Sequence, residues 1–317
     1  MKKEQTKDGF SRPLVQKITL MIKKTILYLA IFTAGFSANS QPNPDLLYLL
    51  EGQKEVKVKE VGLTSIKYTH PNEETIYTIS KLQVRKIVFA SGREEIFESP
   101  IKSVHGLDDF EKVFITYNPE DIAGLHHKGE LFSKATGVTT LSSINQVKNR
   151  ALDKLKAEAA MTGANVVFIG NTFQRGNQFG GENQAGSSTQ TAFSGVGYST
   201  QKINSETVKS MVASRTFHHY QTHRLNRNSW SPERTIATQY DQARKPVMFS
   251  IDEVIEKDGE LYVKTQGLPT KTRDLKVIHI EDNALILMER NEKVTTNYYL
   301  ITDQNKYFKN LASRVVL

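Results

Sequence analysis

The amino-acid sequence predicts an α+β multidomain protein. A small α/β domain with the order β-α-β-β is expected between two small antiparallel β domains, each a barrel or a sandwich. Three observations lead to this fold class. Residues 143–169 combine helical periodicity with a buried strand. Short runs of strand-forming residues, separated by turn residues, occur before and after this segment. The 317 residues, of which 38% are apolar, suffice for two or three domains with their own cores.

The first forty residues have the composition of an export signal. Two lysines precede an apolar run over residues 25–36, and small residues follow up to Ser40. This order predicts a signal peptide cleaved after Ser40, and the run is about half of the ~20 residues that a membrane-spanning helix needs. Met21 is a more ordinary start for such a signal, so residues 1–20 are interpreted as an over-long start. We therefore expect an exported protein, periplasmic or secreted, without a transmembrane span in its mature part.

Charge and cysteine content exclude several classes of function. Residues 1–40 contribute +5 to the formal net charge of +8, so the mature chain carries only +3. The overall basic field of a nucleic-acid-binding protein is therefore absent. The chain contains no cysteine, which excludes disulfides, a lipid anchor on cysteine and thiol catalysis.

The N-terminal small β domain is expected over residues 41–104. Residues 41–44 include two prolines and predict an extended linker. Valine and lysine alternate over residues 56–59, and Ser91-Gly92 predicts a hairpin turn. Short strands at this spacing are typical of a small antiparallel barrel or sandwich.

The α/β domain is expected over residues 105–200. Ser143 is predicted to be the N-cap of its helix, Gln146 to complete a capping box, and Gly163 to close the helix. The other expected elements are a strand over residues 113–117, a small-residue loop over 135–140, a buried strand over 166–169, a glycine-rich loop over 171–190 and a strand over 191–198.

Two stretches of this domain carry a resemblance to a known family. Residues 155–160 (LKAEAA) are followed by GANVV at residues 163–167, and GVGY occupies residues 195–198. This pattern resembles that of small envelope α/β domains, a group that includes the Rcs-system outer-membrane stress sensor and the YbjQ-like proteins, which are described as heavy-metal-binding. The resemblance covers residues 112–200 and implies an envelope α/β domain. Without cysteine, neither the lipid anchor and disulfides of the sensor nor a thiolate metal site carries over. The flanking β segments also resemble exported proteins of the Bacteroidetes type, which implies no activity.

A basic connector is expected over residues 201–245, followed by the C-terminal small β domain over 246–317. The connector holds eight basic and three acidic side chains, a local charge of +5. Because the protein is expected to be exported, this charge suits an anionic glycan, a lipid head group or an acidic envelope protein better than a nucleic acid. The candidate partner-binding residues are Arg215, Arg224, Arg227 and Trp230. In the C-terminal domain, Asp258-Gly259 predicts a hairpin turn.

Three histidines of the connector are metal-ligand candidates. His219 and His223 are four residues apart and would share one face of a helix, with His218 adjacent. No glutamate lies between them as in the zinc-peptidase motif, so a solvated basic segment is the favoured interpretation. We predict no catalytic residue and no cofactor, because the chain has no Gly-x-Ser-x-Gly motif and the glycine-rich loop lacks the Gly-Lys-Ser/Thr ending of a phosphate-binding loop.

The sequence therefore predicts a non-enzymatic exported protein that binds or scaffolds in the bacterial cell envelope. One alternative is a metal-binding protein or metal-dependent enzyme that uses His218, His219 and His223. Another is a structural subunit that assembles through exposed β edges or the connector. The oligomeric state stays open.

Overall fold

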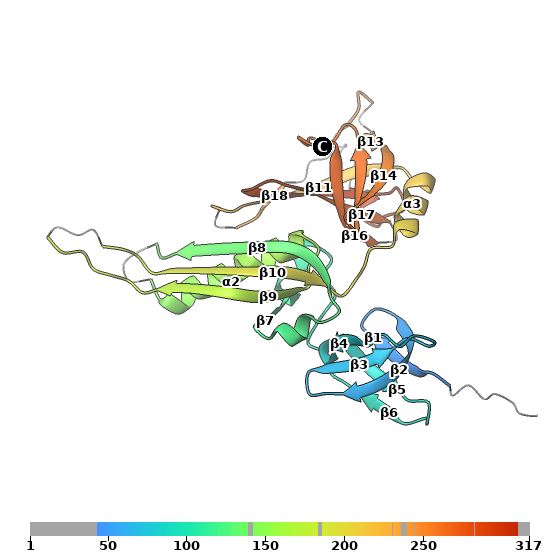
Figure 1. Cartoon of the computed structure of the whole chain (residues 1–317). Coiled ribbons are helices and arrows are strands. Elements are labelled where there is room, and N and C mark those ends of the chain that lie inside the picture. Colours follow the sequence, from blue (N-terminus) through green and yellow to red (C-terminus); the bar gives the residue numbers. More distant parts are fainter. Residues whose placement is uncertain are drawn as a thin grey trace, which may run out of the picture. The chain divides into compact units, whose positions relative to one another are not determined.

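The computed structural model describes residues 43–138, 142–182, 186–229, 231–235, 240–243, 245–281 and 283–309 (Figure 1). The predicted signal peptide and its cleavage site lie outside these ranges. The described residues form eighteen strands, two α-helices and three 3-10 helices. The strands make three sheets of six, four and eight strands. No described helix is long and apolar enough to cross a membrane.

The predicted α+β fold class is wrong, because strands predominate in all three parts of the described chain and none of the three sheets is closed into a barrel. The middle part also departs from the order β-α-β-β. Strand β8 (His126–Thr136) precedes the helix and covers residues that were predicted in part as a loop. The residues of β8 that face the helix include Ser133 and Ala135, which are buried. Because serine and alanine are only weakly hydrophobic and have low strand propensity, the sequence pattern did not predict a strand here.

The N-terminal sheet has the strand order β4-β3-β2-β1-β5-β6, with every pair antiparallel. Its elements are β1 (Asp45–Leu49), β2 (Gln53–Val61), β3 (Ser65–Thr69), β4 (Tyr77–Ser80), η1 (Lys81–Gln83), β5 (Val84–Val88) and β6 (Glu94–Ile96). Leu47, Val56, Ile66 and Ile87 are fully buried and form the centre of its core. In β2 the buried Val56 lies between the exposed residues Glu55 and Lys57, as expected for a strand with one covered face.

The middle sheet has the order β7-β9-β10-β8, and helix α2 covers one of its faces (Figure 1). Its elements are η2 (Leu107–Lys112), β7 (Phe114–Thr116), η3 (Pro119–Ile122), β8, α2 (Ile144–Met161), β9 (Val166–Arg175) and β10 (Gln190–Ser199). The prediction of the helix is confirmed, with Ser143 at the N-cap and Gly163 at a φ of +78°. The Ser143 side chain makes no capping hydrogen bond, so the expected capping box is absent. Val147, Ala151 and Leu155 pack on Phe193 of β10 in a buried core.

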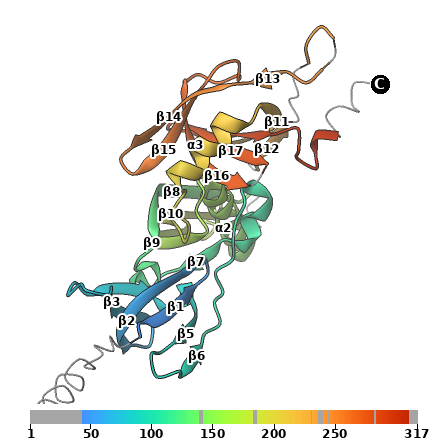
Figure 2. The ribbon, with the colours of Figure 1, turned by 90° about the vertical axis from the view of Figure 1, so that its right-hand side faces the viewer.

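The C-terminal sheet has the order β12-β11-β18-β17-β16-β15-β14, and β13 pairs with β11. Its elements are α3 (Ser205–Ser214), β11 (Phe217–Asn226), β12 (Glu233–Thr235), β13 (Met248–Phe249), β14 (Ile251–Lys257), β15 (Glu260–Thr265), β16 (Asp274–Glu281), β17 (Ala284–Arg290) and β18 (Val294–Ile301). Helix α3 crosses this sheet (Figure 2) and contributes Val208 and Met211 to its core. The hairpin turn predicted at Asp258-Gly259 is confirmed, since both residues have positive φ and join β14 to β15. Residues 201–245, predicted as a connector, contain α3, β11 and β12.

Contacts of α2 and η2 with the C-terminal sheet join the middle and C-terminal parts. Leu107, Ala157, Met161 and Leu225 form a shared apolar cluster. Arg290 Nη2 lies 2.7 Å from Oε1 of Glu158, a buried residue of α2. This ion pair crosses the junction, and both candidate sites use residues that the junction brings together.

Candidate functional site

A basic groove of about 380 Å³ lies where the end of β8, the outer side of α2 and the turn after β11 meet. Four of the eight described residues that line it are cationic, and none of these eight is acidic. The cationic residues are Lys134, Arg150, Lys154 and Arg227. We use the name basic groove for the space lined by these four residues and their neighbours.

Local structure explains why these cations share one groove. Lys134 lies near the end of β8, an edge strand of the middle sheet, and its backbone carbonyl oxygen lies 3.2 Å from Lys154 Nζ of α2. Arg150 and Lys154 are four residues apart on α2 and therefore lie on the same side of the helix. The chain turns after β11, which carries Arg227 to the groove.

Backbone carbonyl groups hold two of the cations in place. Arg150 Nη2 donates to the carbonyl oxygen of Thr136 at 3.1 Å. Lys154 Nζ donates to the carbonyl oxygens of Lys134 at 3.2 Å and Arg227 at 3.0 Å. Burial lowers the pKa of Lys154, and the Glu158 carboxylate partly opposes this effect. Because carbonyl groups carry no net charge, these bonds orient the cations without neutralising them.

One wall of the groove continues onto an apolar surface. The guanidinium of Arg227 lies 5.5 Å from the centre of the Phe132 ring. Phe132, Phe168 and Val196 line an adjoining open hollow of about 540 Å³ on the sheet face away from α2, and Arg227 lines it as well. This arrangement can hold an anionic group in the basic groove with an apolar or ring-shaped part of the same molecule beside it.

The structure places the four predicted partner-binding residues in different surroundings. Arg227 lines the basic groove. Arg215 follows α3 and donates to Oδ1 of Asn283 at 2.5 Å. Arg224 is exposed on β11, opposite Glu233 of β12. Trp230 lies outside the described residues. The other three cations of the groove were missed because they come from segments far away in sequence, although the Arg150–Lys154 spacing was visible.

The predicted metal-ligand histidines lie on strand β11, and their side chains do not converge. The register between β11 and β18 shifts between His219 and Gln221, so the strand contains a bulge. As a result His219 packs against Tyr298, whereas His223 packs against Tyr299 on the other face. His218 Nδ1 lies 3.2 Å from the carbonyl oxygen of Val247.

Burial determines the protonation state of His219 and His223 on β11. It lowers the pKa of His219, and it lowers the pKa of His223 to about 4. The side-chain amide of Gln221 lies 2.5 Å from His223 Nε2, and His223 Nδ1 is buried without a hydrogen-bond partner. Both rings are therefore neutral near pH 7.

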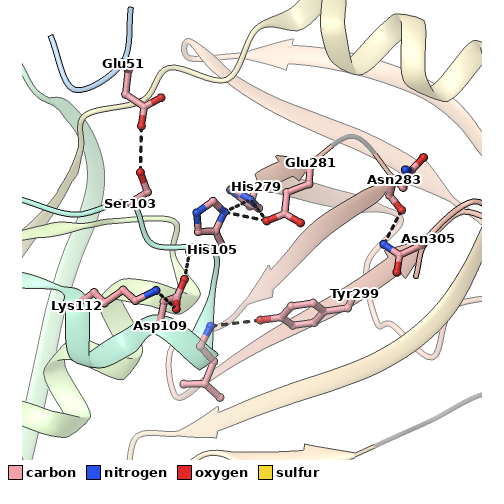
Figure 3. A network of polar contacts seen from close by, with 11 residues as sticks. Glu51, Ser103, His105, Asp109, Lys112, His279, Glu281, Asn283, Tyr299 and Asn305 are labelled. Carbon is pink, nitrogen blue, oxygen red and sulfur yellow. Dashed lines mark hydrogen bonds and ion pairs between the residues drawn. The ribbon is translucent and has the colours of Figure 1, made fainter. Parts of the chain in front are cut away.

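A second polar cluster, formed by His105, His279 and Glu281, lies at the junction of the middle and C-terminal parts (Figure 3). His105 precedes η2, while His279 and Glu281 are two residues apart on β16 and point to the same side of the strand. We call these three residues the His-His-Glu cluster. Hydrogen bonding to His279 is the largest cause that lowers the pKa of Glu281. The cluster joins residues 174 positions apart, so no local spacing could have revealed it.

Comparison with known protein families, curated proteins and solved structures found no match for this chain. The function of the two sites therefore has to be inferred from their own residues.

Proposed function

We propose that this chain is a non-enzymatic exported protein of the bacterial cell envelope and that its basic groove binds an anionic group. The observation that carries the proposal is the gathering of four cationic residues in one groove, with no acidic residue among the described residues that line it. Such a groove raises the local concentration of anions and orients a bound one through charge-assisted hydrogen bonds. The export-signal pattern of residues 1–40 and the envelope-domain resemblance of residues 112–200 support the location.

The surroundings of the basic groove favour a lipid head group or a glycan over a simple inorganic ion. Arg227 belongs to both the groove and the hollow beside Phe132 and Phe168. A ligand with a phosphate or carboxylate next to an acyl chain or a sugar ring would contact both surfaces. The basic groove would bind the charge, and the aromatic rings would cover the uncharged part.

Binding of the full chain to anionic and to zwitterionic lipid vesicles, and to a carboxylated polysaccharide, tests this proposal. We expect binding to one of the two anionic probes, which also identifies the class of ligand, and no binding to zwitterionic vesicles. The double variant Lys134→Gln/Arg227→Gln should lose at least tenfold in affinity, about 1.4 kcal/mol.

The matched control is Lys57→Gln/Arg85→Gln, which removes the same charge from exposed positions of the N-terminal sheet. The proposal requires that this control bind like the unmodified chain. Equal losses in both double variants would mean that net charge alone drives the binding, and the proposed role of the groove would be wrong.

A further inference from the structure

We propose that the His-His-Glu cluster is a binding site for a divalent transition metal ion of the Zn²⁺ type. The site goes beyond the anion-binding function proposed above, because it uses none of the residues of the basic groove. Two imidazole nitrogens and one carboxylate oxygen form a ligand set that suits Zn²⁺, whereas Mg²⁺ and Ca²⁺ favour oxygen ligands.

The three donor atoms already lie at the corners of a small triangle. His105 Nδ1 is 2.9 Å from His279 Nε2 and 2.8 Å from Glu281 Oε1, and His279 Nε2 is 3.2 Å from the same oxygen. In a tetrahedral zinc site with bonds of about 2.0–2.1 Å, neighbouring ligand atoms lie roughly 3.3 Å apart. An outward movement of a few tenths of an ångström therefore converts the cluster into three corners of such a tetrahedron.

Protons cannot satisfy all three contacts at once. When both imidazoles are neutral, each ring carries one proton, on either of its two nitrogens. If both protons lie inside the triangle, two N–H groups face each other across 2.9 Å. If one ring turns its lone pair inward, that lone pair faces the carboxylate oxygen. A metal ion between the three atoms instead accepts a lone pair from each of them.

The residues around the His-His-Glu cluster hold its side chains in place and leave the cluster accessible to an ion. The backbone N–H of His105 donates to Oδ2 of Asp109 at 3.1 Å, and Oδ1 of Asp109 is 2.6 Å from Lys112 Nζ (Figure 3). The His279 side chain is only 10% exposed, which fixes one ligand inside the protein. The side chains of His105 and Glu281 are 43% and 51% exposed, so an ion can enter and a water molecule can complete the coordination.

A metal ion at this position would connect two parts of the chain that are distant in sequence. His105 lies in the segment that enters the middle part, and its two partners belong to β16 of the C-terminal sheet. Because the three ligands cannot converge in the unfolded chain, bound Zn²⁺ would stabilise the junction between these parts.

Zn²⁺ titration of the untagged full chain, with Mg²⁺ as a comparison ion, tests the inference. We expect one equivalent of Zn²⁺ to bind, with no displacement by Mg²⁺ at equal concentration. His279→Gln and Glu281→Gln should each weaken Zn²⁺ binding more than tenfold, because each removes one ligand. His127→Gln, which changes an exposed histidine on β8, should leave the affinity unchanged.

Vesicle and polysaccharide binding in the presence of a chelator keeps this test separate from that of the basic groove. His279→Gln should leave that binding unchanged even where Zn²⁺ binding is lost. Unchanged Zn²⁺ affinity in both cluster variants, or the absence of stoichiometric Zn²⁺ binding by the unmodified chain, would overturn the inference.

Nitrogen NMR of the histidine rings in the unmodified chain gives a second readout that does not depend on how variants fold. On addition of Zn²⁺, coordination shifts are expected at Nδ1 of His105 and Nε2 of His279, the atoms that face the triangle. Coordination shifts at the rings of β11 instead would assign the metal to His218, His219 and His223 and refute the cluster.

Discussion

Acidification should lower the free energy of unfolding of this protein through His223, because the His223 ring has a lower pKa in the folded state than in the unfolded chain. Burial lowers the pKa of His223 from 6.5 to about 4. The unfolded chain therefore binds a proton more readily than the folded one between these two values. The stabilisation is fully present above pH 6.5 and is lost as the pH falls towards 4.

The size of the effect follows from the pKa difference. One pKa unit corresponds to about 1.4 kcal/mol, so the complete loss amounts to roughly 3 kcal/mol. At about pH 5 the free energy of unfolding should be about 2 kcal/mol lower than at about pH 8 from this residue alone. The fully buried ring, with no partner for its Nδ1, supports a value of this order.

Urea denaturation at the two pH values, with a chelator present, measures this contribution. His223→Gln removes the titrating ring, so the pH-dependent loss should shrink by about 2 kcal/mol in this variant. His127→Gln, at an exposed position, should retain the full loss. If His223→Gln lost as much stability on acidification as the unmodified chain, a low pKa for His223 in the folded state would be refuted.

Three further predictions concern the junction and the basic groove. Arg290→Met should destabilise the chain by about 3–5 kcal/mol in urea titrations, because it leaves the buried carboxylate of Glu158 unpaired. Adding Glu158→Gln should recover most of that loss, and an equal loss in the double variant would contradict the pairing. Gly163→Ala should lower the free energy of unfolding by roughly 2 kcal/mol or more, because φ is +78° and the new methyl group would lie 2.8 Å from the carbonyl oxygen of Ile278. Gly259 also has a positive φ, +74°, but a methyl group there would have no atom within 4 Å. Gly259→Ala therefore measures the cost of the backbone conformation alone and should lower the free energy of unfolding by less than Gly163→Ala. Anion binding by the basic groove should weaken with added salt, because salt screens the attraction between charges. An affinity independent of ionic strength would contradict the proposal that the four cationic residues bind the anion.

Local patterns in the sequence predicted the elements that depend on neighbouring residues. The apolar stripe between Ile144 and Ala159, followed by Gly163, was enough to predict α2 and its end. Asp258-Gly259 was enough to predict the turn between β14 and β15. In both cases the interacting residues lie within one or two turns of chain, so the spacing of residue types carries the information.

The sequence by itself thus determined the helix, several strands and the two hairpin turns at Ser91-Gly92 and Asp258-Gly259, while only the tertiary structure decided the fold class and both sites. The bulge after His219 turns His223 to the other face of β11, which separates a histidine pair whose spacing had suggested a metal site. Packing of the C-terminal sheet against the segment before η2 brings His105 to His279, 174 residues away. The basic groove likewise combines β8, α2 and the turn after β11. Such contacts depend on the free energy of packing whole sheets together, which no local spacing of residues encodes.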